Sequence, residues 1–149
     1  MAIKVIGIGN ENRCDDSVGI LIARKLKEEF SDILIVESNG DGSALLGEFE
    51  NIDKLFIIDA AFLEGKQSGE IIIFNPYQEN LSKIFKSFST HSFGLSEAIS
   101  LGIIFKTLPK STFVFAITGR NFDYGNSLSF DFAKVYEEIK NKIKVHLTN

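Results

Sequence analysis

Short apolar runs alternate with segments of helical periodicity along most of this sequence. The first run, IKVIGI, is rich in β-branched residues and does not alternate between polar and apolar positions, which is typical of a strand buried on both faces of a sheet. Between most of the runs, apolar residues return every three or four positions, as on an amphipathic helix. Strands are therefore expected at 3–8, 32–37, 54–61, 69–74 and 111–118, and helices at about 18–30, 43–50, 79–88, 92–105 and 132–143.

This alternation predicts an α/β fold, a three-layer αβα sandwich around a mostly parallel five-stranded sheet. One strand is expected to run the other way. Only the eight residues FLEGKQSG separate the strand at 54–61 from the strand at 69–74, whereas a parallel crossover needs about a dozen or more. The strand at 69–74 is therefore predicted to be antiparallel. Because repeats and Pro-rich or Gly-rich linkers are absent, one domain is expected over residues 1–149.

The charge and cysteine content exclude several classes of protein. The formal net charge is −4, and the one dense basic run, KNKIK at 140–144, is explained by a solvated helix face. No apolar stretch reaches the roughly 18 residues that span a membrane, and no signal-peptide pattern opens the chain. Cys14 is the only cysteine, which fits a reducing compartment. We therefore expect a cytoplasmic, monomeric protein without a membrane or nucleic-acid partner.

Acidic and imidazole side chains are expected to gather at the carboxyl edge of the predicted sheet, where α/β proteins place their working sites. Asp59 ends the third strand, Asp16 lies in the loop after the first strand, and His91 precedes a predicted helix. Two carboxylates and an imidazole form a ligand set suited to zinc, nickel, iron or manganese. A helix cap by Asp15, Asp16 or Ser17 is the simpler alternative, but one cap is enough, so the second acid needs another explanation.

The start of the chain also suggests a dinucleotide site. Gly7 and Gly9 follow the first half of the pattern G-x-G-x-x-G, although Asn12 stands in the place of the third glycine. Glu37, at the end of the second strand, is placed like the acid that binds a ribose. The two adjacent acids of the loop would repel a pyrophosphate at the helix N-terminus, which disfavours this alternative.

A nucleophilic hydrolase is a weaker alternative. The sequence contains no G-x-S-x-G elbow, and a serine, threonine or cysteine nucleophile needs an adjacent base. His91 and His146 are the only histidines, and His146 lies on a lysine-rich helix where we expect it to be exposed. The sequence therefore favours the metal-centred site over a nucleophilic hydrolase.

Several motifs in one order resemble the nickel-iron hydrogenase maturation endopeptidases. These are GIGNENRCDDSVG, then FIIDAA followed by SGEIIIF, then STHSFGLSEAI, and finally GNSLS at the entry to the last helix. Each motif is weak alone, but together they place both acids and the histidine in the family's order and spacing. The resemblance covers residues 3 to about 104 and resumes at 125–129.

The resemblance implies an aspartyl-type endopeptidase that removes the C-terminal extension of a nickel-iron hydrogenase large-subunit precursor after nickel insertion. The family's metal-contacting carboxylate, strand-end aspartate and loop histidine fall on Asp16, Asp59 and His91, and the acid that precedes the first falls on Asp15. Asp16 and Asp59 are thus expected to be catalytic, with His91 completing metal recognition. No cofactor is expected to be permanently bound, because the nickel belongs to the substrate; zinc or cadmium is expected to be able to replace it.

Two loops depart from the family pattern. Many relatives carry an Asp-Gly-Gly-Thr-like loop after the second strand, which would face the substrate, and this chain has Glu37-Ser38-Asn39-Gly40 there. After the fifth strand, relatives often have an acidic or amide residue and a proline, where this chain reads TGRNFDYG and carries Arg120. These departures leave a non-proteolytic accessory or assembly protein of the same fold as one alternative to the endopeptidase. The glycine pattern at the start of the chain leaves a Rossmann-like module that binds a small ligand as another.

Overall fold

A computed structural model of the chain describes residues 1–84 and 92–148. Within them, five strands form one sheet in the order β2-β1-β3-β5-β4. The first four strands in this order are mutually parallel, and β4 pairs antiparallel with β5, as the short connection predicted. The strands are β1 (Ile3–Ile8), β2 (Leu34–Ser38), β3 (Lys54–Ala61), β4 (Ile71–Phe74) and β5 (Ser111–Thr118).

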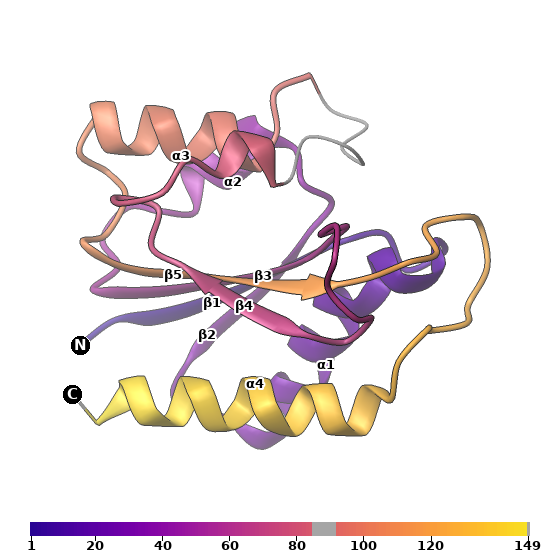
Figure 1. Cartoon of the computed structure of the whole chain (residues 1–149). Helices are drawn as coiled ribbons and strands as arrows, with labels where there is room; N and C mark the ends of the chain where they lie inside the picture. Colours follow the sequence, from indigo (N-terminus) through magenta and orange to yellow (C-terminus); the bar gives the residue numbers. More distant parts are fainter. Residues whose placement is uncertain (85–91, 149) are drawn as a thin grey trace.

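Helices cover both faces of this sheet, which confirms the three-layer prediction (Figure 1). α1 (Val18–Glu29) and α4 (Phe132–Leu147) lie on one face, and α2 (Gly42–Gly47) and α3 (Leu95–Ile104) lie on the other. Two 3₁₀ helices, η1 (Cys14–Ser17) and η2 (Leu81–Lys83), stand in loops. None of the helices in the described residues is long and apolar enough to cross a bilayer.

The helix predicted over 79–88 lies only partly within the described residues. In place of the first part of the helix expected at 79–88, the chain forms the short η2, where the Asn80 side chain accepts a hydrogen bond from the Ser82 amide. The described residues of this segment therefore hold one short 3₁₀ turn. Residues 85–91 lie outside the described part of the chain.

The core has two halves, one on each side of the sheet. Along β3, Phe56 and Ile58 pack toward α1 and α4, whereas Leu55 and Ile57 pack toward α2 and α3. All four side chains are fully buried. A strand that buries both faces cannot alternate polar and apolar residues, which explains the continuous apolar run in the sequence.

Glycines allow α1 to approach β1 very closely. A Cβ atom on Gly7 would lie 2.1 Å from the Gly19 carbonyl oxygen, and one on Gly9 would lie 2.1 Å from the Asp16 carbonyl oxygen. Any other residue at these positions would force the strand and the helix apart. The glycine pattern is thus explained by packing, and it sets η1 directly against the carboxyl end of β1.

Candidate functional site

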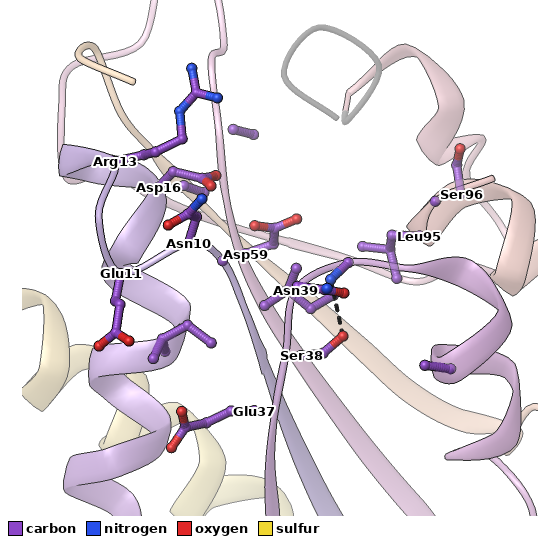
Figure 2. A pocket seen from close by; sticks show the side chains of 18 of the residues that line it. Asn10, Glu11, Arg13, Asp16, Glu37, Ser38, Asn39, Asp59, Leu95 and Ser96 are labelled. Atoms are coloured by element: carbon purple, nitrogen blue, oxygen red, sulfur yellow. Dashed lines mark hydrogen bonds between the residues drawn. The ribbon is translucent and has the colours of Figure 1, made fainter. Parts of the chain in front are cut away.

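A cleft of about 1200 Å³ opens at the carboxyl edge of the sheet. Its walls come from the loop after β1, the loop after β2, the end of β3 and the start of α3 (Figure 2). From β1 the chain first moves to one side, to β2, and then returns to the other side, to β3, so the cleft lies at a topological switch point. Its polar and charged lining includes Asn10, Arg13, Asp16, Arg24, Glu37, Ser38, Asn39, Asp59 and Ser92.

The cleft brings Asp16 and Asp59 together from positions 43 residues apart in the chain. Asp16 belongs to η1 and Asp59 to β3, and Figure 2 shows both carboxylates facing the same part of the cleft. Each side chain is partly exposed. Among the described residues neither carboxylate has an ion-pair partner. The two acids therefore form an unneutralised pair.

Both carboxyl groups of this pair are harder to ionise than a free aspartate. Burial raises the pKa of Asp16 to about 6, although the Arg13 charge and the Asn10 amide oppose this increase. Burial also raises the pKa of Asp59 well above its usual value, the Asp16 charge adds to the increase, and the Ala60 amide opposes it. Such shifts in a cleft are typical of a functional site, and a divalent cation would reverse them by neutralising the pair.

The third predicted ligand, His91, lies outside the described residues. Its neighbour in sequence, Ser92, lines the cleft. Within 1–84 and 92–148, no three His, Cys, Asp or Glu side chains are grouped so that they could hold a metal ion. The described part of the site therefore supplies two of the three predicted ligands, and the histidine stays a prediction.

Asp15 does not cap α1, and this corrects the simpler alternative for the acidic pair. In the described structure no side chain caps that helix, and the Ser17 hydroxyl donates to the Cys14 carbonyl instead. Asp15 is fully buried, and its carboxylate accepts hydrogen bonds from the loop after β5. The donors are the Arg120 amide (2.7 Å), the Asn121 amide (3.0 Å), the Ser129 amide (2.8 Å) and the Ser129 hydroxyl (2.6 Å).

Main-chain hydrogen bonds strengthen the same connection. The Cys14 amide donates to Gly125, the Asp15 amide donates to Asn121, and Gly125 donates back to Asn12. We call this set of contacts between residues 12–15 and 120–129 the Asp15 clamp. A proline at position 120 or 121 would remove one of its donors, which fits the absence of proline from this loop.

The hydrogen bonds of the clamp also determine the charge state of Asp15. Burial alone would raise the pKa of Asp15, but the hydrogen bonds from Asn121, Ser129 and Arg120 outweigh it and leave the pKa below its usual value. Asp15 is therefore an anion whose charge is satisfied inside the protein. It holds η1, and with it Asp16, against the end of the sheet.

Glu37 is not available to a ribose. Its carboxylate is paired with Arg24 at 3.1 Å and with Lys27 at 3.3 Å, and Arg24 also contacts Glu11 at 2.8 Å. Gly7 and Gly9 are explained by packing, and Glu37 is held in ion pairs. The dinucleotide alternative therefore has no support from the residues that suggested it. Ser38 and Asn39 of the same loop do line the cleft, as the family resemblance implied.

One histidine and one arginine differ from the sequence-based expectations. His146 is not freely exposed, because its ring stacks on Phe113 with a centroid distance of 4.1 Å. Arg13 lines the cleft next to the acidic pair, although no motif in the sequence singled it out as a site residue. The only signal that marks Arg13 is its basic character inside the otherwise acidic loop that carries Asp16.

Comparisons with known proteins agree with the fold and with the family that the sequence resembles. The family model of the hydrogenase maturation proteases matches residues 20–146. The hydrogenase 2 maturation protease of Escherichia coli is 29% identical over 104 residues, which cover 67% of this chain but only 62% of that relative. The structure superposes on the hydrogenase maturating endopeptidase HybD from E. coli with a TM-score of 0.79 at 22% identity, over 99% of this chain and 93% of the other. It also superposes on the [NiFe] hydrogenase maturation protease HycI from Thermococcus kodakarensis with a TM-score of 0.72 at 25% identity, over 99% and 93% of the two chains.

Proposed function

Because this chain belongs to the hydrogenase maturation protease family, we propose that it is an endopeptidase that cuts the C-terminal extension from a nickel-iron hydrogenase large-subunit precursor after nickel insertion. The observation that carries the proposal is the unneutralised pair of Asp16 and Asp59 in one cleft. Two carboxylates that have no ion pair with any described residue are costly in a partly buried site, and a divalent cation on the substrate would offset that cost.

The acidic pair of Asp16 and Asp59 recognises the substrate through the metal that the substrate carries. Asp16 and Asp59 would contact the nickel that the precursor already holds, and His91 would complete the set from the segment that leads to Ser92. Oxygen and imidazole ligands suit such an ion. Recognition of this kind makes cleavage depend on prior nickel insertion, because a precursor without nickel cannot neutralise the pair.

Peptide hydrolysis needs an attacking water and a place for its proton. One carboxylate of the pair can accept that proton while the water oxygen bonds to the scissile carbonyl carbon, and the amine leaves with a proton. Polarisation of the carbonyl by the substrate's metal is the second route. Both routes use Asp16 and Asp59, so removal of either side chain is expected to abolish cleavage.

Mass spectrometry of the precursor tests this proposal. Nickel-loaded precursor is expected to lose its extension on mixing, and nickel-free precursor is expected to stay at full length. Asp16→Ala and Asp59→Ala are expected to leave the loaded precursor uncut, whereas Asp32→Ala, an exposed aspartate outside the cleft, should cut normally. A stable complex of wild-type protein and loaded precursor without any loss of mass would instead identify a non-proteolytic accessory protein.

The proposal extends to a cytoplasmic setting. Cys14, the only cysteine, is buried, and its Sγ lies 3.7 Å from the Ser127 hydroxyl. A chain that uses its single thiol for packing needs no oxidising compartment.

A further inference from the structure

Arg13 is held in one orientation beside the acidic pair. Its Nε donates to the Phe122 carbonyl at 3.0 Å, and its guanidinium lies over the Tyr124 ring, 4.8 Å from the centroid. Its main chain forms a parallel bridge with Gly125. Three contacts with one loop thus fix a side chain that is usually flexible, so little conformational entropy remains to be lost when it binds a ligand.

The ends of the Arg13 guanidinium remain available. No hydrogen bond or ion pair joins its Nη atoms to any residue of 1–84 or 92–148. Figure 2 shows the side chain extending away from the Asp16 carboxylate instead of folding onto it. Arg24, which also lines the cleft, is by contrast paired with Glu11 and Glu37. Arg13 is therefore a pre-oriented cation whose two Nη groups have no hydrogen-bond partner among residues 1–84 and 92–148.

The aromatic side chain under Arg13 is unusually exposed. Tyr124 is 79% accessible, and its ring stacks against the Arg13 guanidinium. An exposed tyrosine beside an arginine is the composition typical of binding hot spots. A free, planar guanidinium with parallel N–H groups matches a carboxylate, which it can bind through two hydrogen bonds.

We propose that Arg13, supported by Tyr124, binds an acidic side chain of the precursor close to the scissile bond. This inference rests on the proposed function, because it uses the substrate polypeptide as the ligand. Arg13 and Asp16 lie one turn apart in the same loop, and an extended peptide advances about 3.4 Å per residue. A carboxylate on Arg13 therefore belongs to a residue within about four positions of a bond cut at Asp16 and Asp59.

The position of this contact gives it a specific task. Asp16 and Asp59 repel acidic groups, so an acidic side chain is tolerated only where Arg13 can meet it. The contact would therefore set the register of the peptide, with its acidic residue on Arg13 and its scissile bond at the pair. Selection among precursors by this contact is separate from selection by nickel.

A double-mutant cycle tests the inference by binding, independently of cleavage. The precursor is compared with a variant in which each Asp or Glu within four residues of the cut becomes the amide. Arg13→Gln is expected to weaken binding of the original precursor about 10- to 100-fold and to leave binding of the amide variant unchanged. Arg120→Gln is the matched control, because Arg120 lies on the same loop but outside the cleft and contacts the Lys66 carbonyl.

Three results would overturn the inference: equal weakening of both precursors by Arg13→Gln, no weakening of either, or a precursor with no acidic residue near the cut. Circular dichroism on each variant separates loss of binding from loss of fold. If the wild-type protein binds the precursor without cutting it, the proposed protease function fails while the cycle still decides on Arg13.

A second measurement does not need the precursor. Blocked peptides that carry one glutamate or one glutamine are titrated against the wild-type protein, and the Nε–H signal of Arg13 and the ring signals of Tyr124 are followed by NMR. A shift with the glutamate peptide alone supports the inference. Equal shifts with both peptides, or shifts with neither, would contradict it.

Discussion

Asp15 and Asp16 are neighbours in sequence, yet the protein treats their carboxylates in opposite ways. Burial alone would raise the pKa of both. Hydrogen bonds from a distant loop reverse this for Asp15, whose pKa is lowered, but Asp16 lacks comparable donors and its pKa rises to about 6. The same chemical group thus serves as a structural anchor at one position and as an unsatisfied charge at the next.

The comparison shows that solvent accessibility alone does not decide what an acid does. Asp15 is less accessible to solvent than Asp16, and yet it is the one that stays readily ionised. Asp16 and Asp59 are both partly exposed and both resist ionisation. The hydrogen bonds of the Asp15 clamp thus stabilise the folded protein, whereas ionisation of the neighbouring Asp16 and Asp59 destabilises it.

The largest effect is expected from Asp15→Ala, which should lower the free energy of unfolding by about 3–5 kcal/mol. The substitution removes the acceptor of the Arg120, Asn121 and Ser129 donors and leaves their N–H groups unpaired. Urea denaturation at pH 7 measures the change. Asp123→Ala, at an exposed aspartate of the same loop, is the control and should cost under about 0.5 kcal/mol; a similar cost for both variants would contradict the clamp.

A change of opposite sign is expected from Asp16→Asn. The amide cannot ionise, so at pH 8 the variant should be more stable than the wild type by roughly 1–2 kcal/mol. Asp59→Asn should shift stability in the same direction, whereas Asp32→Asn, on the exposed surface, should not.

The stability difference between Asp16→Asn and the wild type is expected to depend on pH. Since the folded-state pKa of Asp16 lies above the usual value of 3.8, its protonated form favours folding, and that contribution is lost as the pH rises through about 6. The stability gain of Asp16→Asn should therefore grow between about pH 4 and pH 6, stay at its full size above pH 6 and shrink toward zero below pH 4. A gain that is constant from pH 4 to pH 8 would show that ionisation is not its cause.

A smaller effect is expected from Ser129→Ala, which removes one hydroxyl donor from the clamp but keeps the Ser129 amide on Asp15. The expected loss is about 1 kcal/mol. Thermal unfolding of Ser129→Ala, Asp15→Ala and the double variant measures the coupling. If the two losses simply add, the hydroxyl does not act through Asp15.

The smallest effect is expected from Tyr124→Ala, which should change the free energy of unfolding by less than about 0.5 kcal/mol. Tyr124 belongs to the same loop as the clamp, but its side chain is 79% accessible and buries little apolar surface. The same denaturation measurement applies. A loss as large as that of Ser129→Ala would place Tyr124 among the structural residues and not at a binding surface.

Local sequence patterns predicted most of the fold. β1 and β5 have the predicted bounds because continuous apolar runs mark doubly buried strands, and the direction of β4 followed from the length of one loop. The strand order was not predictable, because each strand could pair with any other without changing its own pattern. At the start of the helix predicted over 79–88 the structure has the short η2.

The site was predictable only in part, for a similar reason. Asp16 and Asp59 were selected because parallel strands end at one edge, a rule that needs no knowledge of contacts. The task of Asp15 was not predictable, since its donors lie 105 to 114 residues away in sequence. Arg13 was missed because the sequence does not show which arginine is paired. Only the structure shows that Arg24 pairs with Glu11 and Glu37, whereas Arg13 contacts Phe122 and Tyr124.

The Asp15 clamp has a consequence for the timing of synthesis. Asp15 leaves the ribosome early, but the loop that satisfies it follows more than 100 residues later, roughly 5 to 20 seconds at ordinary elongation rates. Until then the anion must stay hydrated, and η1 cannot settle against β1 in its final form. A growing chain therefore cannot present a finished cleft until residues 120–129 have been made, and a chain that stops before residue 120 never acquires one.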